Sequence, residues 1–142
     1  MDWHFFEAWN LMSFDRKKYP KIFTALYTVI PLIPADMATR LDGTLVYVPG
    51  MVYGEAFEIK NWDRIIYLDG HIEKLSQKKA NHVVAHEIAH VVLGHTDLDC
   101  QPLQGVEWDE QPREIEAVMF AEKLGFERVY KRKRAKRTMC GL

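Results

Sequence analysis

The chain has 142 residues, of which 48% are hydrophobic and 27% charged, and its formal net charge is −1. These values are typical of a soluble globular protein with one domain and its own core. Cys100 and Cys140 are too few for a disulfide framework, and the first seven residues lack the basic region of a signal peptide. Because no apolar run approaches the roughly 18 residues of a membrane span, we expect a cytoplasmic protein without membrane contact.

The first third of the chain is predicted to be mainly helical. Residues 2–18 place apolar and aromatic side chains at helical spacing as far as the Tyr19-Pro20 step, where a helix must end. Residues 21–30 are apolar and rich in β-branched residues, so helix and strand compete there, and we favour a helix. Residues 35–41 can add a short helical turn before Asp42-Gly43.

From residue 44 the apolar residues alternate with period two, which is typical of strands. Three short strands are predicted over residues 44–48, 57–60 and 64–68, with turn sequences between them. We expect these strands to form a small, mainly antiparallel meander.

Two helices and an acidic loop are predicted for the second half of the chain. Ser76 is a candidate N-cap for a helix over residues 77–93, and Gly94 can adopt the left-handed conformation that ends it. Residues 96–111 gather acidic side chains without periodicity and are predicted to form a loop. Pro112 suits the first turn of a helix over residues 112–124, which Gly125 ends.

The first of these helices contains His86-Glu87-Ile88-Ala89-His90, which has the pattern H-E-x-x-H. Residues four apart share a helix face, so the imidazoles of His86 and His90 can bind the same metal ion. Glu87 follows His86 directly and can accept a proton from a metal-activated water. The pattern predicts a Zn²⁺ site in which His86 and His90 are ligands and Glu87 is the catalytic acid/base.

A catalytic zinc ion takes a third protein ligand. The metzincin pattern would place a histidine at position 96, which is a threonine here, so a carboxylate on the helix over residues 112–124 is favoured. An apolar stripe on that helix is expected to face the core: Ala117, Phe120, Ala121 and Leu124. Glu116 stands before this stripe, and an inward carboxylate is costly unless it is paired or metal-bound. Glu116 is therefore the predicted third ligand, while Glu114, which this count turns elsewhere, and the aspartates of the acidic loop are alternatives.

These features together predict an α+β, zincin-like fold, in which a small, mainly antiparallel three-stranded sheet packs against a metal-binding helix and further helices. Residues 1–130 are expected to form this single domain, followed by a basic tail over residues 131–142. The tail could make weak contacts with nucleic acid or an acidic partner, although a solvated terminus is the simpler interpretation.

Three stretches carry a family resemblance when they are taken in this order: Ile66-Tyr67-Leu68, the metal helix from Ala85 to His95, and Glu116-Ala117-x-x-Phe120-Ala121. Together they resemble the ImmA/IrrE-type metallopeptidases over residues 64–125. The resemblance implies zinc ligation by His86, His90 and Glu116, with Glu87 as acid/base. It also implies cleavage of an intracellular protein, such as a regulator or repressor of a mobile element.

The predicted function is thus a zinc-dependent peptidase that acts on a protein substrate. Two alternatives are a metal-containing module of the same fold that binds protein or nucleic acid without proteolysis, and a zinc hydrolase for non-peptide amides. Three residues are candidates to stabilise the oxyanion: Tyr53, Tyr67 and His95. His82, one turn before His86, is expected to contact the metal ligands without binding the metal itself, or to lie on the surface. Three loop residues could accept hydrogen bonds from the histidine ligands: Asp97, Asp99 and Asp109.

Overall fold

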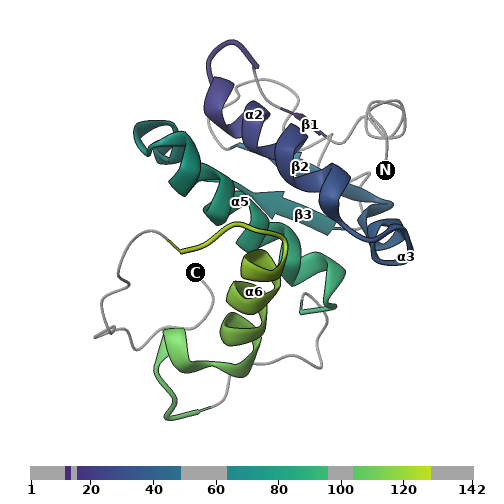
Figure 1. The fold of residues 1–142 in the computed structure, drawn as a ribbon, viewed down its shortest axis with the longest axis vertical. Coiled ribbons are helices and arrows are strands. Elements are labelled where there is room, and N and C mark those ends of the chain that lie inside the picture. Colours follow the sequence, from purple (N-terminus) through teal and green to yellow (C-terminus); the bar gives the residue numbers. More distant parts are fainter. Residues whose placement is uncertain (1–11, 14–15, 49–63, 96–103, 129–142) are drawn as a thin grey trace.

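A computed structural model describes residues 12–13, 16–48, 64–95 and 104–128 of the chain (Figure 1). Most of these residues are helical. The four α-helices are α2 (Pro20–Val29), α3 (Ala35–Ala38), α5 (Gln77–Val92) and α6 (Pro112–Lys123). Four short 3-10 helices accompany them: η1 (Ile30–Leu32), η2 (Thr39–Leu41), η3 (Gly70–Lys74) and η4 (Trp108–Glu110). None of the helices in these described ranges is long and apolar enough to cross a membrane.

Three short strands pair side by side in the order β1 (Met12–Ser13), β2 (Thr44–Tyr47) and β3 (Arg64–Tyr67). Both pairings are parallel, with Met12 opposite Val46 and Val46 opposite Ile66. The predicted architecture, an α+β, zincin-like fold with a mainly antiparallel three-stranded sheet, is therefore wrong. The described part of the chain is mostly helical, and its short strands run in the same direction.

The physical reason for this error is that alternation of apolar residues reports a half-buried strand but carries no information on pairing direction. A parallel pair needs a connection of about a dozen residues or more, and residues 48–63 supply one between β2 and β3. The predicted strand over residues 57–60 lies outside the described residues. The predicted helix over residues 2–18 lies mostly outside them, and its two residues Met12 and Ser13 form β1 instead.

Helix α2 confirms the preference for helix over strand in residues 21–30. Pro20 occupies its first turn, where the missing N–H costs nothing, but Tyr19 offers no side-chain cap. The carboxylate of Glu73 takes that role from a distance, because it accepts hydrogen bonds from the backbone N–H groups of Lys21 and Ile22 at 3.0 and 2.7 Å. This contact joins the start of α2 to η3, just before α5.

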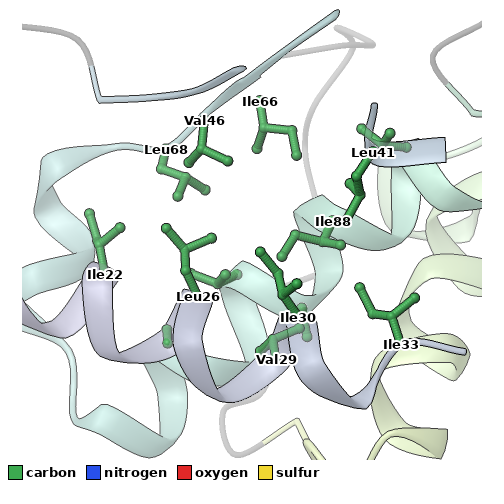
Figure 2. Close-up of a cluster of buried hydrophobic side chains, with 14 of the residues drawn as sticks. Ile22, Leu26, Val29, Ile30, Ile33, Leu41, Val46, Ile66, Leu68 and Ile88 are labelled. Carbon is green, nitrogen blue, oxygen red and sulfur yellow. The ribbon is translucent and has the colours of Figure 1, made fainter. Parts of the chain in front are cut away.

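The core lies between the strands and two helices that run across the same face of them, α2 and α5 (Figure 1). Figure 2 shows Val46, Ile66 and Leu68 pointing from the strands towards Leu26 of α2 and Ile88 of α5. All five side chains are buried. Helix α6 packs against α5 as well, so α5 is the element that connects the core to α6 (Figure 1).

The predicted ends of α5 and α6 are confirmed. Ser76 caps α5, since its hydroxyl accepts a hydrogen bond from the backbone N–H of Lys79 at 3.3 Å. Gly94 and Gly125, which follow the two helices, have φ values of 79° and 101°, in the region that glycine tolerates best. The chain therefore turns sharply at the end of each helix, and the turn at Gly94 shapes the site described next.

Candidate metal centre

Helix α5 holds His86 and His90 on the face that meets α6. Their Nε2 atoms lie 3.2 Å apart, and their ring centroids are 4.9 Å apart in an edge-to-face arrangement. His86 is 9% exposed, and the residues around it on the helix, such as Ala85 and Ala89, are fully buried. The expected one-turn spacing of the two imidazoles is thus confirmed, and both nitrogens point to the same place.

The carboxylate that meets them belongs to Glu114, in the first turn of α6. Its Oε1 lies 2.9 Å from His86 Nε2, and its Oε2 lies 3.2 Å from His90 Nε2. Glu114 is only 3% exposed. His86, His90 and Glu114 form a group that could hold a metal ion, since their candidate ligand atoms all lie within 4.8 Å of one another.

Glu116, which the sequence analysis selects as third ligand, lies elsewhere. Its side chain is 62% exposed, and its Oε1 contacts His95 Nε2 at 3.2 Å, whereas the carboxylate beside His86 and His90 is that of Glu114. The expectation that Glu116 points inward and Glu114 outward is therefore wrong. The buried alanines of α6, Ala117 and Ala121, show why: one helical turn before Ala117 on the same face is position 114.

The three groups fit a metal ion both in distance and in chemistry. Nitrogen and oxygen ligands of a tetrahedral zinc ion lie about 3.3–3.4 Å apart, because each bond is about 2.0–2.1 Å long. The distances of 2.9 to 3.2 Å among the two Nε2 atoms and the carboxylate are close to these values. If both nitrogens instead carried protons for the carboxylate, two N–H groups would face each other at 3.2 Å. A cation between three lone pairs removes that conflict.

The electrostatics of the group favour an ionised carboxylate. Burial by itself would raise the pKa of Glu114, but hydrogen bonds from His86 and His90 and their charges lower it more, so its pKa lies below the usual value. Arg113 Nε, 4.0 Å from Glu114 Oε2, adds positive charge nearby. Two imidazoles and one anionic oxygen donor form a ligand set that suits Zn²⁺ and related transition metals.

The structure describes some of the remaining predicted site residues. Glu87 is half-buried on α5, next to His86. His82 is buried one turn before His86, with ring centroids 6.3 Å apart, and its Nδ1–H donates to the carbonyl of Phe126 at 2.7 Å. Tyr67, a candidate for oxyanion stabilisation, is 54% exposed at the end of β3. Four other candidates lie outside the described residues or have undescribed side chains: Tyr53, Asp97, Asp99 and Asp109.

His95 is buried, with 6% exposure, and its ring lies beside that of His90. Burial, followed by the charge of His90, lowers the pKa of His95 from its usual value, although Glu116 opposes the shift. Sequence reasoning did not anticipate this contact, because residues five apart do not share a face on a continuing helix. The glycine before His95 was the available signal, since it ends the helix and turns the chain back.

None of three comparisons, with protein-family models, with curated proteins and with solved structures, gives a match to this chain.

Proposed function

We propose that the protein is a zinc-dependent peptidase whose metal ion is held by His86, His90 and Glu114. The observation that carries the proposal is the meeting of Glu114 with the two histidines of an H-E-x-x-H helix, in a group with little solvent exposure. Three protein ligands leave a tetrahedral ion one open position, which is the arrangement of catalytic rather than structural zinc sites. Glu87 completes the set as the carboxylate beside the first ligand.

Bound zinc would act as a Lewis acid that makes a coordinated water acidic near neutral pH. Glu87 would be the general base that accepts a proton from the attacking water as the water oxygen bonds to the carbonyl carbon of the substrate. When the carbon–nitrogen bond breaks, Glu87 returns the proton to the leaving amine. Glu114 takes no part in this proton transfer, because its carboxylate would be one of the metal ligands.

The substrate class we propose is an intracellular protein, such as a regulator or repressor of a mobile element. This part of the proposal rests on the sequence resemblance to ImmA/IrrE-type metallopeptidases, in which Glu116 belongs to the shared motif. The ligand set proposed here departs from that motif, because the third ligand is Glu114, two residues before Glu116.

The test compares wild-type protein with Glu87→Gln, which keeps the size of the side chain but cannot act as a base. Both proteins are analysed for zinc and then incubated with a host lysate, and new protein N-termini are identified by mass spectrometry. We expect about one zinc per chain in both proteins, and new termini only with the wild type. A chelator should abolish cleavage and added zinc should restore it.

The same experiment separates the proposal from its alternatives. If both proteins hold zinc and the lysate gains no new termini with either, the protein is a metal-containing binding module rather than a peptidase. If neither holds zinc and the wild type still cleaves, the proposed metal centre is wrong. His86→Ala provides the control for metal loss, because it removes one ligand and leaves Glu87 in place.

A further inference from the structure

The turn at the end of α5 brings His95 back against the metal group. Gly94, with φ of 79°, lets the backbone N–H of His95 donate to the carbonyl of His90 at 2.7 Å, while the N–H of Gly94 donates to Val91 at 3.0 Å. This pair of bonds is a Schellman motif, and it reverses the chain direction. The ring of His95 therefore lies 5.2 Å from the ring of His90, centroid to centroid.

Three side chains form a continuous chain of contacts that starts at the metal group. His90 Nδ1 lies 3.0 Å from His95 Nδ1, and His95 Nε2 lies 3.2 Å from Glu116 Oε1. His90 uses its other nitrogen, Nε2, to face His86 and Glu114. Both ring nitrogens of His95 thus have partners, one in His90 and one in Glu116. His95 contacts His90 at Nδ1, the nitrogen that does not face His86 and Glu114.

Of the two arrangements of protons on two neutral rings, only one satisfies both contacts of His95. The Glu116 carboxylate accepts, so His95 Nε2 carries a proton, and His95 Nδ1 is then an acceptor. His90 Nδ1 must therefore donate to it, which leaves His90 Nε2 with a lone pair. The opposite arrangement would put two acceptors, His95 Nε2 and the carboxylate, face to face at 3.2 Å and a proton on His90 Nε2.

We propose that His95 and Glu116 are positioning residues for the metal ligand His90: they hold its ring in place and select the tautomer that presents the Nε2 lone pair to the metal. This inference rests on the proposed metal centre. The sequence predicts Glu116 as a metal ligand, whereas here Glu116 reaches the ligand His90 only through His95. The positioning role of His95 also removes it from the candidates for oxyanion stabilisation, because both of its nitrogens already have partners.

The two positioning residues contribute unequally. His95 is buried, so water does not replace its acceptor nitrogen if the ring is removed. Glu116 is 62% exposed, and water can substitute for much of its contact with His95. Groups that hydrogen-bond a metal-binding histidine from behind typically change metal affinity by about 10–100-fold when mutated. We expect His95 to lie in this range and Glu116 below it.

The experiment measures zinc affinity by competition with a chromophoric chelator in the full chain. His95→Leu, which cannot accept the His90 proton, is expected to bind zinc about 10–100-fold more weakly than wild type. His95→Asn is the matched control, because its side-chain oxygen can accept from His90 Nδ1–H, and it should recover most of the affinity. Nitrogen NMR of the zinc-loaded proteins should show a protonated Nδ1 on His90 in wild type and in His95→Asn.

Each outcome bears on a different statement. Wild-type affinity in His95→Leu, or equal losses in His95→Leu and His95→Asn together with an unchanged His90 tautomer, would overturn the positioning role while leaving the metal centre intact. Absence of saturable zinc binding in wild type would overturn the metal centre and the inference together. Urea unfolding of the metal-free variants shows whether an affinity loss comes from the contact or from a damaged fold.

Discussion

Removing the carboxylate of Glu114 is expected to weaken zinc binding far more than removing that of Glu116, two residues further along the same helix. Glu114→Ala deletes one of three protein ligands. Structural zinc sites with four ligands bind with about 10–16 kcal/mol, or about 2.5–4 kcal/mol per ligand if the energy is shared equally. This corresponds to a loss of roughly 10²–10³-fold in Kd.

Glu116→Ala is the matched control because it makes the same chemical change on the same helix. Its side chain is 62% exposed and reaches the metal group only through His95, so we expect a loss of less than about tenfold. Loss of helix propensity does not distinguish the two variants, since alanine is the best helix former.

Two assays measure the difference. Competition with a chromophoric chelator gives the two Kd values directly. Urea unfolding with zinc at 100 times the wild-type Kd gives a second reading, because binding then stabilises wild type by about 2.7 kcal/mol. A Kd that is 10²–10³-fold larger reduces this stabilisation to about 0.4 kcal/mol or less.

A larger loss in Glu116→Ala than in Glu114→Ala would refute the reasoning, since it would put the exposed carboxylate at the metal. Equal losses would refute it too, because burial and contact distance would then carry no information on ligation. If Glu114→Ala does not fold, Glu114→Gln keeps the side-chain volume and removes the charge. Metal-free unfolding curves of all variants provide the reference.

Three further predictions concern the scaffold of the site. Burial lowers the pKa of His82, so below about pH 6.5 the unfolded chain binds a proton there that the folded chain does not, and stability falls as the pH falls towards the folded pKa. His82→Asn can still donate to Phe126 but does not titrate, so its urea midpoint, measured with chelator present, should fall less between pH 7 and pH 5 than that of wild type. Equal falls in the two proteins would contradict this. Gly94→Ala should cost about 1–2 kcal/mol in urea unfolding because of its φ of 79°, whereas an unchanged midpoint would mean that the turn relaxes. Glu73→Ala leaves two N–H groups of α2 without their acceptor and should cost about 1–3 kcal/mol by the same measurement. A loss below about 0.5 kcal/mol, which is about half of a typical hydrogen bond, would show that water replaces the carboxylate.

Local features of the fold could be predicted from the sequence because they depend on neighbouring residues. Ser76 caps α5 and Gly94 ends it as expected, since a hydroxyl acceptor and a left-handed backbone are properties of single residues. The one-turn spacing of His86 and His90 follows from helix geometry alone. These short-range rules are sufficient to identify the metal-binding helix.

The sheet could not be predicted in the same way. The strands over residues 44–48 and 64–68 were expected, but the alternation of apolar residues that indicates a strand does not tell whether the strand pairs in a parallel or an antiparallel sense. The third strand, Met12–Ser13, is too short to give a pattern, and its place in the sheet is known only from its pairing with β2. Pairing direction and strand order are properties of the assembled core rather than of any single segment.

The sequence by itself determined that a helix carries the H-E-x-x-H pattern and that a carboxylate on the helix over residues 112–124 could complete a metal-binding group. Only the tertiary structure decided which carboxylate does so, because the rotation of α6 about its own axis is set by packing of Ala117 and Ala121 against α5. A shift of two residues on a helix turns a side chain by about 200°. That rotation separates Glu114, which is buried beside His86 and His90, from Glu116, which is exposed and contacts His95.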